Sequence, residues 1–186
     1  TLKTPVSKLS PHVGFVWQNT NDQLFRPTVR EEVLTSTKIF HPYDPLWCDE
    51  LFNRFGLLPL LDRSPFSLSE GQKKRVSFAA ALAAKPDLIV LDEPTAGQDE
   101  LFRRELTGFI TRLQKTGGTI VLVTHDLEFA AEHANRWLVL SEGQMIADGA
   151  PDEVMADSVV MAKAGLRPTQ RFQLTQAIKH LIEGKA

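Results

Sequence analysis

Two acidic side chains stand next to each other where a short apolar stretch of the sequence ends. The stretch from Leu88 to Leu91 has the composition of a buried strand, and Asp92 and Glu93 follow it directly. Because neighbouring residues of a strand point to opposite sides, one carboxylate is placed to hold a metal ion while the other faces a reacting water. That division of labour is what phosphoryl transfer to water requires.

A helix start with phosphate-compatible residues comes shortly before this acidic pair. In the segment Leu68-Ser-Glu-Gly-Gln72, Ser69 is suited to cap a helix and Gln72 stands at the capping-box position. Main-chain N–H groups at a helix N-terminus and a nearby hydroxyl are donors for phosphate oxygens, and the helix dipole favours the negative charge. The sequence therefore predicts a phosphate-facing helix start.

Polar side chains also follow two other apolar runs. Val13–Trp17 leads to Gln18, and the β-branched run Thr119–Thr124 leads to His125. Strands that alternate with helices predict an α/β fold with a mostly parallel sheet, covered on both faces. Ligands of such sheets bind beyond the carboxyl ends of the strands. We therefore expect Gln18, the acidic pair and His125 to form one site.

The remaining segments predict helices around this sheet. Residues 22–67 resemble a small helical insertion, with helices expected over Val29–Leu34 and Pro45–Phe55. Residues 137–147 predict a β-hairpin. From about residue 151 the composition changes, and the tail has helical patterns without residues that indicate catalysis.

The composition of the chain excludes several classes of protein. It has 186 residues, a net charge of -2 and one cysteine, so it has neither a disulfide framework nor a strongly basic surface for nucleic acid. No apolar run approaches the roughly 20 residues needed to span a bilayer. The basic run Lys73-Lys-Arg75 is interpreted as a solvated helix face.

Taken in order, these segments resemble the nucleotide-binding domain of ABC ATPases over about residues 13–150. The resemblance implies an α/β fold: a partial P-loop NTPase (RecA-like) core in residues 1–150, with a helical subdomain over about 22–84, and a C-terminal helical appendage over 151–186. The matching segments are Gln18 (Q-loop), Leu68–Gln72 (signature motif), Leu88–Asp92 (Walker B strand), Glu93 (catalytic glutamate), Ala96–Asp99 (D-loop) and His125 (switch histidine).

The resemblance also implies an ATP hydrolase that uses ATP and Mg²⁺. A hard cation favours carboxylate oxygen, which fits an Asp as the metal ligand. The implied roles are Mg²⁺ binding for Asp92 and Gln18, polarisation of the attacking water for Glu93, contact with the γ-phosphate for His125, binding of the opposite subunit's ATP for Ser69, Gly71 and Gln72, and a place at the dimer seam for Asp99.

The loop after Gln18 narrows the resemblance further. Residues 18–33, together with Gly165, Leu166 and Pro168, resemble the cobalt and energy-coupling-factor branch of importers. This implies an ATP-binding subunit that couples ATP binding and hydrolysis at a dimer interface to transport of a metal ion or vitamin. The implied partners are a transmembrane transporter subunit and a second ATPase subunit, identical or different, without nucleic acid. The implied location is peripheral, at the cytoplasmic face of the cell membrane.

The sequence departs from the family pattern because one motif is absent from it and two motif residues are replaced. The P-loop pattern G-x-x-x-x-G-K-[ST] does not occur in these 186 residues, and in the family it would precede Thr1. We therefore expect the chain by itself neither to bind ATP tightly nor to hydrolyse it, and an exposed strand edge or apolar face could drive self-association. Glu70 replaces a common glycine of the signature motif, and Gln98 replaces a leucine of the D-loop.

Two other functions remain open at this point. One is a soluble, non-transport ABC ATPase that acts on ribosomes or DNA, although the chain has no long coiled coil or basic arm. The other is a non-catalytic association fragment that donates Ser69 and Gly71 to a partner's nucleotide. Capture of a membrane protein, as opposed to co-sedimentation with ribosomes or DNA, would separate the first function from the importer.

Overall fold

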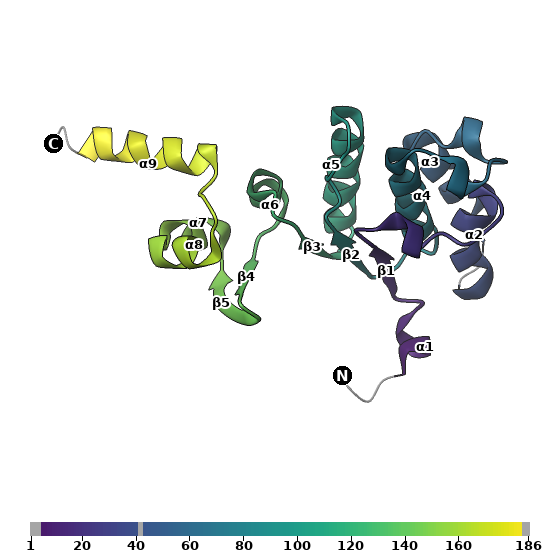
Figure 1. Cartoon of the computed structure of the whole chain (residues 1–186), viewed down its shortest axis with the longest axis horizontal. Coiled ribbons are helices and arrows are strands. Elements are labelled where there is room, and N and C mark those ends of the chain that lie inside the picture. Colours follow the sequence, from purple (N-terminus) through teal and green to yellow (C-terminus); the bar gives the residue numbers. More distant parts are fainter. Residues whose placement is uncertain (1–4, 41–42, 184–186) are drawn as a thin grey trace. The chain divides into compact units, whose positions relative to one another are not determined.

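The computed structural model describes residues 5–40 and 43–183, which form two compact units (Figure 1). The first unit is Thr1–Thr124 and the second is His125–Ala186. The division predicted at residue 150, between an ATPase-like domain and an appendage, stays a prediction.

A parallel three-stranded sheet forms the centre of the first unit. Its strands are β1 (Val13–Val16), β2 (Leu88–Asp92) and β3 (Thr119–Val123), in the spatial order β1-β2-β3. Each strand is short and rich in Val, Ile, Leu or Phe, as expected for strands of a parallel sheet. The register pairs Val16 with Leu91 and Asp92 with Val123, so all three strands end at the same edge. The predicted α/β class with a parallel sheet is confirmed.

Helices and short 3₁₀ turns make up most of the rest of the first unit. The first of these helices, α1, is a single turn just before β1. The helices are α1 (Val6–Leu9), α2 (Val29–Phe40), α3 (Pro45–Arg54), α4 (Glu70–Ala83) and α5 (Glu100–Lys115), with short 3₁₀ turns at Thr20–Asp22, Leu58–Leu60 and Pro65–Ser67.

An aromatic cluster and one glycine fix how α4 packs. Phe78 of α4 packs against both Phe55 and Phe102, with ring centroids 6.1 Å and 5.2 Å away, and these two rings are also 6.1 Å from each other; all three are buried. On the other side, α4 approaches β1 closely at Gly14. A Cβ atom there would lie 2.7 Å from the carbonyl oxygen of Ala81, so the strand and the helix can touch only without a side chain.

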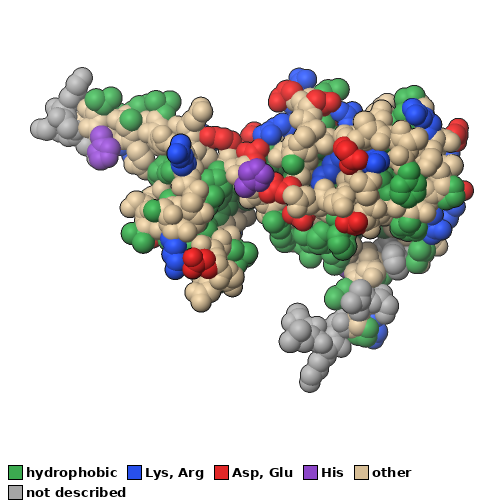
Figure 2. Space-filling view, in the orientation of Figure 1, with side chains coloured by type: hydrophobic (Ala, Val, Ile, Leu, Met, Phe, Trp, Pro, Cys, Tyr) green, Lys and Arg blue, Asp and Glu red, His purple; other side chains and the backbone are tan. Residues whose placement is uncertain are grey.

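The sheet is covered on one face only in the part of the first unit that the structure describes. Val16, Ile89 and Leu91 are buried against the helices, whereas Phe15 and Val121 on the other face are 40% and 44% exposed. Figure 1 shows α4 and α5 on the same side of the strands, and Figure 2 shows hydrophobic side chains gathered along the lower side of this unit. The expectation that helices cover both faces is wrong for these described residues.

The second unit is built on an antiparallel hairpin, as the sequence predicts. Its pairing is reinforced by Arg136, whose guanidinium donates to both carboxylate oxygens of Asp148 at 2.7 Å. No described helix is long and apolar enough to cross a membrane. The elements are α6 (Leu127–His133), β4 (Trp137–Ser141), β5 (Gln144–Gly149), α7 (Pro151–Ala156), α8 (Ser158–Ala164) and α9 (Gln170–Glu183).

Candidate functional site

The ends of β1 and β2 bring two of the predicted site residues to one edge of the sheet. Because Val16 pairs with Leu91, the chain leaves both strands side by side. Gln18 lies two residues beyond β1 and is exposed, while Asp92 is the last residue of β2 and is half-buried. The first half of the predicted constellation is therefore assembled by the register of the sheet.

Lys74 lies between these two strand ends. Its ammonium donates hydrogen bonds to the carbonyl oxygens of Trp17 at 2.7 Å, Gln18 at 3.3 Å and Asp92 at 3.1 Å. The side chain is buried, with 4% of the residue exposed. Burial lowers the pKa of Lys74, and the nearby charges of Asp92 and Glu93 oppose this shift. The interpretation of this basic run as a solvated helix face is wrong for Lys74.

Lys73 is buried as well and contacts the turn that follows Gln18. Its ammonium donates to Asn21 Oδ1 and to Glu70 Oε1, each at 2.8 Å. Thr20 Oγ1 donates to the other carboxylate oxygen of Glu70 at 3.5 Å. The Lys73 ammonium also holds the pKa of Glu70 below its usual value. The unusual acidic residue of the signature segment thus joins the start of α4 to the loop after β1.

Glu93 has an uncommon backbone conformation. Its φ is +45°, in the left-handed region that costs an L-residue about 1–2 kcal/mol. The main chain is held there because the Glu93 N–H donates to the carbonyl of Val123 at 2.8 Å, and Thr124 Oγ1 donates to Glu93 Oε2 at 3.2 Å. Since β2 ends at Asp92, strand alternation does not set the direction of Glu93. Maintained strain of this kind is a feature of functional sites.

The start of α4 has the predicted capping box. Ser69 Oγ accepts a hydrogen bond from the N–H of Gln72 at 3.3 Å, and the Gln72 side chain accepts one from the N–H of Ser69 at 3.1 Å. A Cβ atom at Gly71 would lie 3.9 Å from the side chain of Gln98, so the signature segment and the D-loop segment are neighbours. The hydroxyl hydrogen of Ser69 is left to donate elsewhere, since its oxygen is the acceptor in the cap.

Asp99 uses both carboxylate oxygens within the first unit. One oxygen accepts from the N–H of Phe102 at 2.7 Å and caps α5, and the other accepts from the guanidinium of Arg75 at 2.5 Å. Arg75 also lies over the ring of Phe102, 5.6 Å from its centroid. Sequence reasoning missed this role of Arg75, and the predicted place of Asp99 at a dimer seam stays a prediction.

His125 is the first residue of the second unit and is exposed. The structure thus brings together Gln18, Asp92 and Glu93 in the first unit, and the predicted contact between His125 and a γ-phosphate remains a prediction.

The residues at this edge fit Mg²⁺ held together with a phosphate. Asp92 offers a carboxylate and Gln18 an exposed amide oxygen, which are the oxygen donors that a hard cation prefers. No cluster of three or more His, Cys, Asp or Glu side chains suited to a metal occurs among the described residues. Mg²⁺ typically binds through one or two carboxylates plus phosphate oxygens, so the sparse donor set agrees with that mode.

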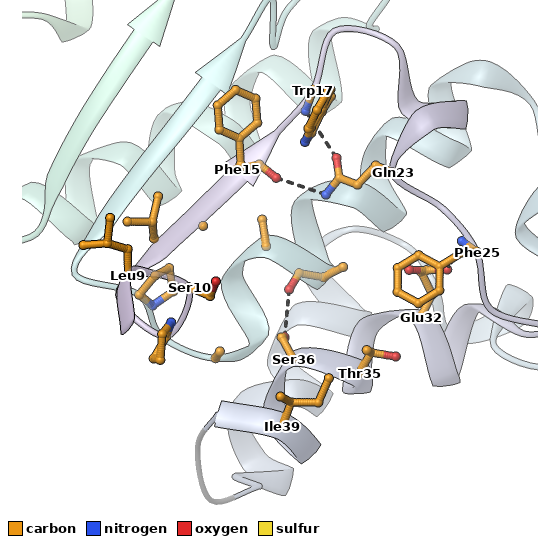
Figure 3. Close-up of a pocket in the computed structure, with 17 residues that line it drawn as sticks. Leu9, Ser10, Phe15, Trp17, Gln23, Phe25, Glu32, Thr35, Ser36 and Ile39 are labelled. Carbon is orange, nitrogen blue, oxygen red and sulfur yellow. Dashed lines mark hydrogen bonds between the residues drawn. The ribbon is translucent and has the colours of Figure 1, made fainter. Parts of the chain in front are cut away.

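A groove lies beside the loop that carries Gln18 (Figure 3). It has a volume of about 680 Å³ and is lined by β1, α2 and α4 and by the loop residues Trp17, Gln23 and Phe25. Gln23 fastens the loop to the strand, since its side chain accepts from the N–H of Trp17 at 3.2 Å and donates to the carbonyl of Phe15 at 3.0 Å. Because Trp17 and Gln23 belong to the loop that carries Gln18, the groove borders this loop.

The rim of the groove is apolar and its floor is rigid. Phe25 and Ile39 are 62% and 61% exposed. Glu32 is buried, and one carboxylate oxygen accepts from the N–H groups of Phe25 and Arg26, each at 2.7 Å. Ser36 Oγ donates to the carbonyl of Ala80 at 3.1 Å and ties α2 to α4. Exposed apolar side chains on a fixed backbone are typical of a protein-binding surface.

Curated relatives of the chain are ATP-binding proteins of energy-coupling factor transporters. The chain is 36% identical over 179 residues to EcfA2 of Mycoplasmopsis synoviae, covering 94% of this chain and 57% of the relative. It is 38% identical over 180 residues to EcfA of Methanothermobacter thermautotrophicus, covering 95% and 58%. The chain therefore spans a little less than three fifths of the length of these relatives.

A solved structure with the same fold is cbiO1 of Clostridium perfringens, described as part of the ABC transporter complex cbiONQ. It has a TM-score of 0.63 and 32% identity, over 92% of this chain and 70% of that chain. The dimeric ATP-binding cassette MJ0796, bound to ADP and Pi, has a TM-score of 0.70 and 26% identity, over 80% and 68%. Residues 2–96, more than half of the chain, match the model of the ABC transporter family. With the motifs in order at the strand ends, this match shows that the chain belongs to the ABC transporter family, as an ATP-binding domain.

Proposed function

We propose that this chain is the ATP-binding subunit of an importer of the energy-coupling-factor type and takes part in ATP hydrolysis. The observation that supports this most is the placement of Gln18 and Asp92 at neighbouring strand ends, with Glu93 held in a strained conformation just beyond. The two relatives named for energy-coupling factor transporters support the importer type.

The side chains have separable tasks in this proposal. Asp92 and Gln18 hold Mg²⁺ through oxygen, and the metal when bound neutralises charge on the nucleotide phosphates. Glu93 orients and polarises the attacking water, and its fixed main chain limits where the carboxylate can lie. Ser69, Gly71 and Gln72 face the ATP of a second ATPase subunit, and His125 contacts the γ-phosphate.

The chain by itself is expected to be inactive, because no P-loop pattern occurs in its sequence. The P-loop amides and lysine form most of the phosphate cradle in P-loop proteins. Titration of the chain with Mg-ATP should show no tight binding, and low-micromolar affinity would contradict this part of the proposal.

The test of catalysis adds the chain to an ATP-binding subunit that carries a P-loop. The mixture should hydrolyse ATP faster than the P-loop subunit alone, and Glu93→Gln should remove the increase, because the amide cannot polarise water as the carboxylate does. Glu100→Gln, at the first residue of α5, is the matched control and should keep it. If the wild-type chain has no effect on the rate, the catalytic proposal is wrong.

The groove beside the Gln18 loop is proposed to bind a helix of the transmembrane subunit. Its exposed apolar rim and its continuity with Gln23 and Trp17 support this, because a partner seated there would contact the loop that leads to the metal site. Phe25→Glu should weaken capture of the membrane partner, whereas Phe66→Glu, at an equally exposed phenylalanine outside the groove, should not. Co-sedimentation of the chain with ribosomes or DNA, without membrane capture, would instead favour the soluble ATPase.

The transported substrate is proposed to be a metal ion or a vitamin, and the subunit is proposed to lie at the cytoplasmic face of the membrane. Both statements rest on the importer branch of the relatives. Uptake of labelled cobalt and of vitamins by cells with and without the intact subunit would test the substrate.

A further inference from the structure

Lys74 is a buried cation whose hydrogen-bond partners are all main-chain carbonyls. Its ammonium reaches the carbonyls of Trp17, Gln18 and Asp92, and it forms no ion pair within 4.0 Å among the described residues. An ammonium group has three N–H donors, so the three carbonyls can use all of them. The cation is therefore fully satisfied by the backbone of two different strands.

This arrangement joins segments that are far apart in the sequence. Trp17 and Gln18 follow β1, Asp92 ends β2, and Lys74 belongs to the second turn of α4. A buried charge is costly unless hydrogen bonds compensate it. Removal of the ammonium thus leaves three carbonyls without this donor at the place where the site residues leave the sheet.

We propose that Lys74 is a positioning residue of the candidate site: its ammonium holds together the main chain at the ends of β1 and β2 and so sets where Gln18 and Asp92 present their side chains. An effect of Lys74 on catalysis rests on the proposed ATPase function. The hydrogen bonds by which Lys74 joins the two strand ends do not depend on that function, because they involve only atoms of the first unit.

The link also reaches the signature segment. Lys74 lies five residues after Ser69 on the same helix, and Lys73 contacts Asn21 in the turn after Gln18. A displacement of the Gln18 loop relative to β2 must therefore either move α4 or break the hydrogen bonds of Lys74. The two lysines differ in their acceptors, since Lys73 binds only side-chain oxygens and Lys74 binds only main-chain oxygens.

Amide hydrogen exchange of the whole chain tests this without nucleotide. In Lys74→Ala, amides of residues 17–23 and 92–95 should exchange about tenfold faster or more, since a loss of about 1.4 kcal/mol in local stability corresponds to that factor. Amides of α5 should be unchanged. Propylammonium, which replaces the missing part of the side chain, should restore protection, and 1-propanol of similar size should not.

Lys73→Ala is the matched control because it removes a buried ammonium one residue away. Its exchange should increase around residues 20–22 and stay unchanged at 92–95. The proposal is wrong if Lys74→Ala exchanges like the wild type, if exchange rises uniformly over the first unit, or if the alcohol protects as well as the amine.

A second pair of variants keeps the test decisive if Lys74→Ala does not fold. Lys74→Arg retains a cation with several donors, whereas Lys74→Met retains a chain of similar length without donors. Protection at 17–23 and 92–95 should survive in the Arg variant and be lost in the Met variant, and equal exchange in both would overturn the proposal. ATPase failure with intact exchange behaviour would instead count against the proposed function.

Discussion

At the scale of single residues, the backbone of Glu93 carries a measurable strain. Its φ of +45° is easily adopted by glycine and costs other residues about 1–2 kcal/mol. Glu93→Gly should therefore be more stable than Glu93→Ala by about 1 kcal/mol, although both variants lose the carboxylate. Urea denaturation of the two variants measures the difference.

The same pair of substitutions at Arg104 provides the control. Arg104 is an exposed residue inside α5, where glycine is ordinarily less stable than alanine by about 0.5–1 kcal/mol. The order of the Gly and Ala variants should thus reverse between the two positions. An equal order at both would mean that the conformation of Glu93 stores no strain.

Ser69 caps α4, and one substitution can separate this role from the proposed contact with a partner's phosphate. Ser69→Ala should cost about 1 kcal/mol because α4 loses its cap, whereas Ser69→Asp should keep the stability, since Asp caps as well as Ser. The Asp variant nevertheless loses the hydroxyl donor and places a negative charge where the proposal puts a partner's phosphate. It should therefore abolish stimulation of a P-loop-bearing partner while unfolding like the wild type. A destabilised or fully active Asp variant would contradict this separation.

The sequence predicted that Gln18 and Asp92 lie at one edge of the sheet because the ends of parallel strands meet there, and the register confirms that these strand ends meet. Sequence reasoning misread Lys73 and Lys74 because charged side chains are usually exposed. The signal was present in the spacing: Lys74 precedes the buried Phe78 by four residues and so lies on the same helical face. Which acceptors compensate the buried charge could not be predicted, since they belong to loops distant in sequence.

At the scale of helices and strands, Glu50 links α3 to α5. Its carboxylate accepts from Arg54 in the same helix and from Arg112 of α5, and these guanidinium groups, Arg112 first, hold the pKa of Glu50 below its usual value of 4.5. A folded-state pKa below the unfolded one contributes stability above the unfolded pKa, which is lost as pH falls through the folded pKa.

Glu50→Gln should therefore lower the free energy of unfolding by about 0.5–1 kcal/mol at neutral pH, a screened value because the side chain is 36% exposed. The difference from the wild type should shrink below about pH 4. Urea denaturation across this range checks it. Glu105→Gln is the control, since Glu105 lies 3.7 Å from Arg54 and should show a smaller effect. A difference that is independent of pH would contradict the ionic explanation.

At the scale of the whole molecule, the open face of the sheet predicts association. Phe15, Val121 and Val123 are between 40% and 51% exposed, and strands of parallel sheets are ordinarily covered on both faces. Val121→Lys should reduce concentration-dependent self-association in sedimentation experiments at little cost in stability. Leu46→Lys, at an exposed leucine of α3 outside the sheet, is the control and should leave association unchanged. A monomeric wild-type chain at all concentrations would contradict the prediction.

The alternation of strands with helices along the sequence predicted a parallel sheet but not which of its faces is covered. Val13–Val16 and Leu88–Asp92 are apolar at nearly every position, which is typical of strands buried on both sides. The pattern cannot predict which element covers each face of the sheet, because the cover depends on packing between segments that are distant in the sequence.

Hydrogen bonds hold α4 at both of its ends, so we expect the helix to move as one rigid body. At its start, Lys73 and Lys74 hold it to the Gln18 loop, and at its end the indole of Trp47 donates to the carbonyl of Leu82 at 3.0 Å. Its 14 residues span about 21 Å, so a tilt of about 5° shifts one end relative to the other by about 2 Å. A displacement of the loop is therefore expected to reach the N-terminal turn of α3 through a tilt of α4.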